Sequence, residues 1–226
     1  TASEEVGLIG AHNLEFDRIH ARRLINLDCG PEGVFCCGSA GGQVTDLRLP
    51  LRREEAQGLP LTIRIRGLSG GHSGGLIHKG LGNANVLMGR ILRNLCQAFP
   101  CRLIQCDGGD KDNAIPRECD AVVLVEESSK EQAQAIVNRV EAEIQGQLMP
   151  EDENFHIELE WAPAGSCQAV TAEDTVKMMH LMVMLPCGPQ LRDLTMNDRV
   201  VSSENFASVH TDDQGVKCVI SMRSSN

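Results

Sequence analysis

Two adjacent carboxylates near the start of the sequence, Glu4 and Glu5, have the residue type and spacing for a hydrolytic metal site. On an extended chain, neighbouring side chains point to opposite sides. One carboxylate can therefore bind a metal ion while the other faces the water that loses its proton. Most Glu-Glu pairs are solvated surface residues, so the pair needs further support from the rest of the chain.

Asp28 is a second candidate acid. It ends the segment LINLD (residues 24–28), which we read as a short buried strand. Ligand sites in α/β sheets gather at the carboxyl ends of strands, so an acid at this position is a candidate metal ligand. An equally good interpretation is a residue that caps or turns the chain.

The most specific local feature is one imidazole among four glycines, Gly-Gly-His72-Ser-Gly-Gly, at residues 70–75. Glycines allow close approach of the backbone and unusual torsions. The imidazole of His72 could then donate a hydrogen bond to an oxyanion. The spacing and lysine of a phosphate-binding loop are absent. The competing interpretation is a flexible turn with an exposed histidine, and nothing argues for a function of His78 in the same segment.

Three further residues could bind a peptide. The segment NAIPRE (residues 113–118) supplies the amide of Asn113 and the guanidinium of Arg117, beside a proline that stiffens the chain. Arg223 lies at the end of an expected strand near the C-terminus. Arginine matches carboxylates through two parallel hydrogen bonds, so either arginine could hold the terminal carboxylate of a peptide. Each one alone is more often part of a surface salt bridge.

The composition excludes several classes of protein. A formal net charge of −10 and an aromatic content of 3% argue against a nucleic-acid-binding surface. No apolar run is long enough to span a membrane. The ten cysteines contain no C-x-x-C pair, which excludes a zinc finger and favours reduced, buried thiols in a cytoplasmic protein.

The elements that must position these residues follow from hydrophobic periodicity. Alternation with a period of two predicts strands around residues 61–65 and 155–161, each with one covered face. Apolar runs predict further strands at 119–125 and 216–222. Such strands belong to an antiparallel or mixed sheet.

Helical spacing of apolar residues predicts helices at 84–98 and 129–148, and a third that Thr171 begins. Ser128 and Glu131 have the spacing of a capping box for the second helix. The methionines at 178–184 are expected in the core. From about residue 47 the pattern predicts an α+β fold with helices on one face of the sheet. Residues 1–46 are expected to be part of a different domain, with a hinge at 47–60.

Taken together, these segments resemble one family. TASEEVG, LINLD, GSAGG, GLSGGHSGGLIHKGLGNAN and GGDKDNAIPRE occur in that order in the aminoacyl-histidine dipeptidases (the peptidase D family). The match is dense to about residue 118. Beyond that point it thins to the strand pattern and to the segment from SSEN to SMRS.

The resemblance implies a carnosinase-like zinc metallopeptidase that acts on dipeptides, with two zinc ions per complete site. It implies that Glu4 is the general base and that Glu5 and Asp28 are zinc ligands. His72 resembles the lid histidine that reaches the active site of the partner subunit in a homodimer and polarises the scissile carbonyl. Asn113 and Arg223 resemble substrate-binding residues of the lid, and the same motif implies this role for Arg117.

The same resemblance divides the chain into a part of the α/β zinc-peptidase catalytic domain (1–46) and a lid or dimerisation domain (47–226). Family members carry a His-x-Asp motif and a bridging Asp before the position of Thr1, and a zinc-binding His after the position of Asn226. The chain is therefore expected to be a central fragment that lacks several metal ligands and is inactive alone. After Asp28, Cys29 and Gly30 stand where the family usually has acids.

Three functions remain open from the sequence. The first is a dipeptidase for Xaa-His substrates, an activity that the complete protein would carry. The second is a related tripeptidase or a deacylase of N-acyl amino acids. The third is a non-catalytic lid module that dimerises or binds peptide ends. This interpretation is favoured because only two zinc ligands remain, which is too few for a two-metal site.

Overall fold

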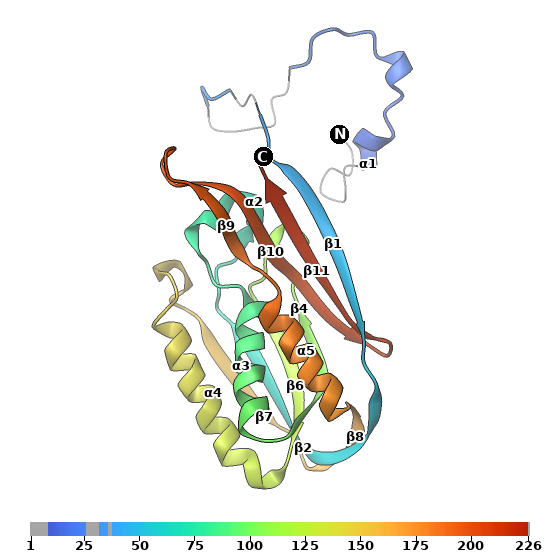
Figure 1. The fold of residues 1–226 in the computed structure, drawn as a ribbon, viewed down its shortest axis with the longest axis vertical. Coiled ribbons are helices and arrows are strands. Elements are labelled where there is room, and N and C mark those ends of the chain that lie inside the picture. Colours follow the sequence, from blue (N-terminus) through green and yellow to red (C-terminus); the bar gives the residue numbers. More distant parts are fainter. Residues whose placement is uncertain (1–8, 26–31, 36–37, 226) are drawn as a thin grey trace. The chain divides into compact units, whose positions relative to one another are not determined.

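The computed structural model describes residues 9–25, 32–35 and 38–225 of the chain (Figure 1). Internal contacts divide the chain into two compact units, Thr1–Ser39 and Ala40–Asn226. The described part of the first unit holds two short helical turns, α1 (Ile9–His12) and η2 (Phe16–Arg18), with no buried residue in either. Assignment of the first unit to a catalytic domain stays a prediction.

A buried strand was expected at residues 24–28, of which the structure describes residues 24 and 25. These two residues, Leu24 and Ile25, form no strand, and they are 91% and 84% exposed. A strand is stabilised by pairing with a neighbour, and the described part of the first unit contains no other strand. Residues 26–28 of that segment lie outside the described residues.

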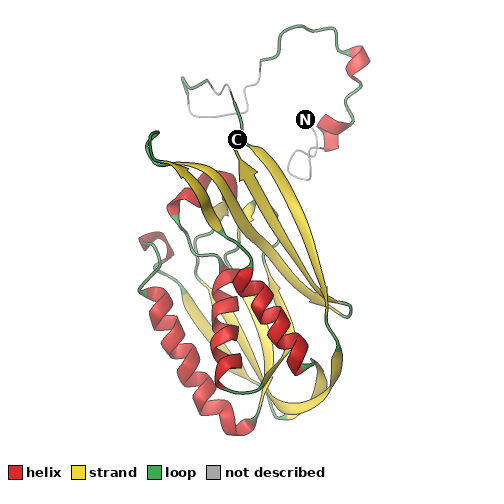
Figure 2. Cartoon of the chain, viewed as in Figure 1, coloured by secondary structure: helices red, strands yellow, loops and turns green. Residues whose placement is uncertain are grey.

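The second unit is built on a nine-stranded antiparallel sheet (Figure 2). The main path has the order β1-β11-β10-β4-β6-β2-β7, while β8 pairs with β2 and β9 pairs with β10. The bounds are β1 Gly41–Pro50, β2 Arg53–Arg66, β4 Cys101–Gly108, β6 Cys119–Val125, β7 His156–Trp161, β8 Gly165–Val170, β9 Gly188–Asp193, β10 Arg199–Asp212 and β11 Gly215–Ser224.

The alternation around residues 61–65 is confirmed by the long strand β2. Leu61, Ile63 and Ile65 are fully buried on one face, and the polar residues between them are half-buried on the other. The strands expected at 119–125, 155–161 and 216–222 are β6, β7 and β11. One covered face is what this alternation dictates, because successive side chains of a strand point to opposite sides.

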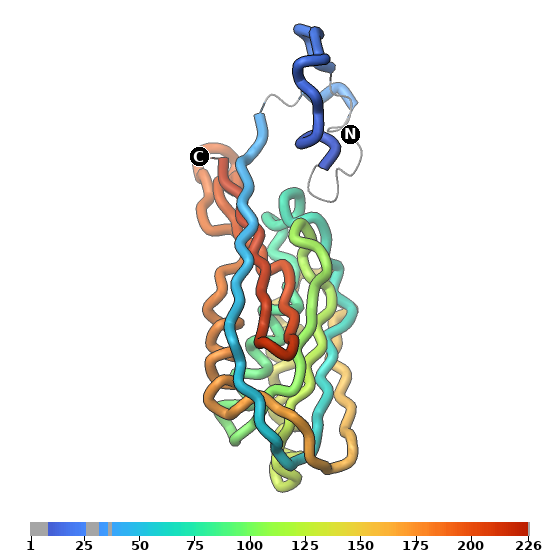
Figure 3. The backbone as a smooth tube through the Cα atoms, turned by 90° about the vertical axis from the view of Figure 1, so that its right-hand side faces the viewer, coloured from blue at the N-terminus to red at the C-terminus, as the bar shows by residue number. Residues whose placement is uncertain are grey.

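Three helices cover that face: α3 (Ala84–Ala98), α4 (Lys130–Gln145) and α5 (Ala172–Met184) (Figures 1 and 3). Their apolar residues recur every three or four positions, so each helix buries one stripe, as Met88, Ile91 and Leu95 do on α3. The α+β lid fold with a one-sided sheet is thus confirmed. Short turns complete the unit: η3 (Ile77–Lys79), η4 (Glu127–Ser129) and η5 (Pro150–Asp152).

The predicted helix starts have mixed outcomes. Thr171 caps α5, because its hydroxyl accepts a hydrogen bond from the backbone N–H of Asp174 at 3.3 Å. The capping box of Ser128 is wrong. Residues 127–129 form the turn η4, so Ser129 takes the N-cap position of α4 and makes no side-chain cap bond. The hydroxyl of Ser128 instead donates to the carboxylate of Glu126.

One further expectation, the hinge at residues 47–60, is wrong. Most of residues 47–60 lies in β1 and β2 rather than in a hinge, because β1 pairs along its whole length with β11 and the start of β2 pairs with β8. The prediction of buried thiols holds for four of the seven described cysteines, while Cys96, Cys167 and Cys187 are half-buried. Those seven thiols are free, and Cys101, Cys106, Cys119 and Cys218 are buried.

Candidate functional site

The glycine-rich loop forms a compact structure around His72. The short strand β3 (Gly71–His72) ends at this histidine, and the helical turn α2 (Ser73–Leu76) begins after it. Gly70 and Gly71 have φ values of +62° and +136°, which side-chain-bearing residues rarely adopt. The glycines are therefore needed to bring the histidine to the start of α2.

The local hydrogen bond of His72 defines what its ring can do. The backbone N–H of Gly75 donates to Nδ1 of His72 at 3.2 Å. An accepting Nδ1 carries no proton, so we assign the proton of the neutral ring to Nε2. His72 is exposed, so its Nε2–H can donate a hydrogen bond to a bound molecule. This is the property required to polarise a carbonyl oxygen.

Asn113 lies next to His72. The strand β5 (Ala114–Ile115) pairs with β3 so that His72 stands opposite Ala114. The backbone carbonyl of Asn113 accepts hydrogen bonds from the N–H of Ser73 at 2.8 Å and from its hydroxyl at 3.1 Å. The backbone of the half-buried Asn113 is therefore joined to the loop that carries the histidine.

Arg223 reaches the same place from the far end of the chain. It lies on β11 opposite Ser203 of β10. A Cβ atom built on Gly74 would lie 2.9 Å from Nε and Cζ of Arg223, and 3.0 Å from Cε1 of His72. Both side chains therefore flank Gly74. Nε of Arg223 is buried and has no hydrogen-bond partner among the described residues.

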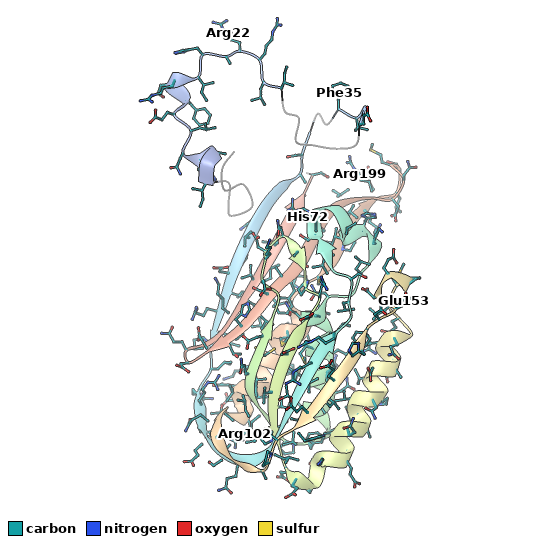
Figure 4. The ribbon with its side chains drawn as sticks, turned by 180° about the vertical axis from the view of Figure 1, so that it is seen from behind. Arg22, Phe35, His72, Arg102, Glu153 and Arg199 are labelled. Atoms are coloured by element: carbon teal, nitrogen blue, oxygen red, sulfur yellow. The ribbon has the colours of Figure 1, made fainter. Side chains whose placement is uncertain are left out.

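An open pocket of about 680 Å³ adjoins this cluster. Its charged lining includes two arginines that the sequence did not single out, Arg192 and Arg199. The guanidinium of Arg192 donates to the carboxylate of Asp198 at 2.8 Å, so its charge is compensated. Figure 4 labels His72 and Arg199 at the same end of the second unit. Folding brings Arg192 and Arg199 to the pocket that Arg223 also lines, so no local sequence signal could have identified them.

Arg117 is placed differently from the other predicted residues. Its exposed side chain lines a smaller pocket of about 370 Å³ together with Gly109, Asp110 and Lys111. That pocket and the one beside Arg223 have no lining residue in common. The structure thus brings His72 and Arg223 together at Gly74, and it places the side chain of Arg117 against Gly70 of the same glycine-rich loop.

The predicted metal site cannot be assembled from the described residues. Glu4, Glu5 and Asp28 all lie outside them. Within residues 9–25, 32–35 and 38–225, no three His, Cys, Asp or Glu side chains come together as a metal site. Among the helices of this described part, none is long and apolar enough to cross a membrane.

Comparison with known proteins gives three findings. Residues 63–152 match the family described as the peptidase dimerisation domain. The chain is 33% identical over 224 residues to the cytosol non-specific dipeptidase of Escherichia coli (strain K12), a match that covers 97% of this chain and 46% of that protein. The crystal structure of the aminoacylhistidine dipeptidase from Vibrio alginolyticus matches with a TM-score of 0.84 and 27% identity.

That structural match covers 98% of this chain and 45% of the Vibrio alginolyticus chain. The chain thus spans about half the length of the relatives that it matches. The resemblance in the motifs is confirmed over almost the whole chain, and the matched dimerisation domain lies within the residues predicted as the lid. The chain is therefore similar to these dipeptidases over about half their length, and its residues 63–152 match the peptidase dimerisation domain family.

Proposed function

We propose that this chain is the dimerisation and substrate-binding part of a zinc-dependent dipeptidase that hydrolyses Xaa-His dipeptides. The observation that carries the proposal is the meeting of His72 and Arg223 at Gly74, in a chain related to dipeptidases. An imidazole donor beside a guanidinium suits a small peptide, which offers a carbonyl oxygen and a terminal carboxylate.

Arg223 is assigned to the terminal carboxylate of the substrate. Its buried Nε has no hydrogen-bond partner among the described residues, and leaving such a donor unpaired costs about 1 to 3 kcal/mol. A carboxylate would satisfy Nε and a terminal nitrogen together, in the parallel geometry that arginine favours. The amide of Asn113, next to the loop, is assigned to the same substrate.

His72 is assigned to the scissile carbonyl. Its Nε2–H donates to the carbonyl oxygen, and this bond strengthens as negative charge develops there during attack by water. The fixed Nδ1 bond to Gly75 keeps the ring in the donating tautomer. By the same proposal, Glu4 removes the proton from the attacking water.

Zinc, when bound, would supply an activated water and neutralise charge on the oxyanion. By resemblance Glu5 and Asp28 are two of its ligands, and two carboxylates alone are too few for a two-metal site. We therefore propose that the remaining ligands come from other parts of the complete protein, and that the isolated chain has no dipeptidase activity.

We further propose that the complete protein is a homodimer in the cytoplasm, joined through the lid. The description of the matched family as a dimerisation domain supports self-association. The name of the Escherichia coli relative supports the location. In such a dimer, His72 would act in the active site of the partner subunit.

The test is hydrolysis of a substrate panel by the complete protein, with and without zinc. The panel contains Ala-His, Ala-Leu, Ala-Ala-His and N-acetyl-His, which separates a dipeptidase from a tripeptidase and from a deacylase. We expect zinc-dependent turnover of Ala-His and none by residues 1–226 alone. Absence of zinc-dependent dipeptide hydrolysis by the complete protein would overturn the proposal.

A further inference from the structure

The small sheet that carries His72 is joined to the main sheet by a buried side chain. Asn205 lies on β10 and is 1% exposed. Its amide Nδ2 donates to the backbone carbonyl of Ala114 on β5 at 2.7 Å. Ala114 is the residue directly opposite His72 in the β3–β5 pair, so this hydrogen bond holds the strand partner of the histidine.

The other end of the Asn205 amide is held as well. Its Oδ1 accepts a hydrogen bond from Nδ2 of Asn83 at 3.2 Å. Asn83 is the N-cap of α3, and its Oδ1 accepts from the N–H groups of Asn85 and Val86. The Asn83 amide also donates to the carbonyl of Phe206 at 3.0 Å. Both amides are therefore fixed in orientation by their surroundings.

A buried polar residue with matched partners restricts the structure to one arrangement, because any shift leaves unpaired groups in the core. The pairing of β3 with β5 spans two residues on each strand, so by itself it holds the loop weakly. The bond from Asn205 adds a fixed point on the nine-stranded sheet, on which Arg223 also lies.

We propose that Asn205 is a positioning residue that sets His72 relative to Arg223. The hydrogen bond to Ala114 holds β5, β5 holds β3 through their pairing, and β3 ends at His72. Arg223 is carried by β11, the neighbour of β10, so the strand that bears Asn205 is the reference for both groups. This inference rests on the proposed role of His72 in polarising the substrate carbonyl.

The experiment is a double-mutant cycle in the complete enzyme with Asn205→Ala and His72→Ala, reading kcat and KM. A displacement of about 1 Å at a reacting group costs up to about 100-fold in rate. We expect Asn205→Ala to lower kcat by about 10- to 100-fold, with little change in KM. In the His72→Ala background it should change kcat by no more than about twofold, because the group it positions is gone.

The matched control is Asn94→Ala. Asn94 also makes two side-chain hydrogen bonds, since its Nδ2 donates to the carbonyl of Arg90 at 2.9 Å and its Oδ1 accepts from Arg139 at 2.9 Å. These bonds lie on the helices α3 and α4, away from the β3–β5 pair. The control should lower stability without lowering kcat. If Asn205→Ala does not fold, as judged by circular dichroism, Asn205→Ser takes its place.

The outcomes separate this inference from the proposed function. An equal loss of kcat from Asn205→Ala in both backgrounds would overturn the positioning role while leaving that of His72 intact. Unchanged turnover in His72→Ala would instead overturn the proposed function of the histidine, and the inference would fall with it. Coupling between the two substitutions supports both.

Discussion

Gly74 is the residue at which the proposed site can be perturbed with least damage to the fold. The residue is exposed, lies in the helical turn α2, and has no positive φ that would exclude a side chain. In Gly74→Ala, the new methyl group would lie 2.9 Å from Nε and Cζ of Arg223 and 3.0 Å from Cε1 of His72. Carbon atoms do not approach so closely, so the end of the flexible arginine side chain must move.

The expected loss of kcat/KM in Gly74→Ala follows from the hydrogen bonds that Arg223 is proposed to make to the substrate. A hydrogen bond to a charged group contributes about 1.5 to 3 kcal/mol. At about 1.4 kcal/mol per factor of ten, displacement of the guanidinium should lower kcat/KM by roughly 10- to 150-fold. The folded state should change little in stability. Alanine is favoured over glycine by about 0.5 to 1 kcal/mol within a helix, which offsets the cost of moving a side chain.

Gly75→Ala is the matched control. It lies in the same helical turn and is also exposed, but its Cβ would meet only Nδ1 of His72, at an ordinary contact distance of 3.9 Å. The backbone N–H that donates to His72 is retained. We expect kcat/KM within about threefold of the unsubstituted enzyme, well below the loss of one charged hydrogen bond.

The assay is steady-state hydrolysis of a dipeptide by the complete enzyme, together with urea unfolding of each variant. Equal kcat/KM for Gly74→Ala and Gly75→Ala, at equal stability, would refute the assignment of Arg223 to the substrate. A large loss of stability in Gly74→Ala alone would refute the argument that the arginine can move at low cost.

Two further predictions concern the scaffold. The carboxylate of Asp174 is 4% exposed and accepts hydrogen bonds from the side chain and backbone of Arg52, which hold its pKa well below the ordinary 3.8. The unfolded chain therefore binds this proton more tightly, so the stabilisation is present above about pH 4 and lost as the pH falls further. Asp174→Asn should cost about 1.5 to 3 kcal/mol at pH 7 and flatten the acid limb of stability in urea titrations, and an unchanged acid limb would contradict this. Burial raises the pKa of Cys218 to about 12, with a smaller contribution from Cys106, so iodoacetamide at pH 8 should label Cys218 only after unfolding. Rapid labelling of the folded chain, detected by mass spectrometry, would contradict that prediction.

Hydrophobic periodicity was sufficient to predict the elements whose apolar pattern is regular. The helix at 84–98 and the strand at 119–125 have the bounds that were expected. In both, the spacing of apolar residues follows from the geometry of the element itself. Such patterns are local, so one segment at a time can be read from them.

The strand β10 shows what periodicity cannot give. Its inward residues include Ser203, Asn205 and Ser208, all buried. A polar segment of this kind forms a strand because β11 and β9 pair with it and because Asn205 finds partners on β5 and at the start of α3. Those partners come from distant parts of the chain, so no pattern within residues 199–212 specifies them.

The sequence by itself determined the glycines that shape the loop, the histidine within it and the resemblance to the dipeptidases. These are properties of short segments, set by residue type and backbone torsion. Only the tertiary structure decided that Arg223 meets His72 at Gly74, that Arg117 packs against Gly70, and that Asn205 ties the loop to the sheet. The reason is physical: the distance between two side chains on different strands depends on register and packing across the whole sheet, which local sequence does not contain.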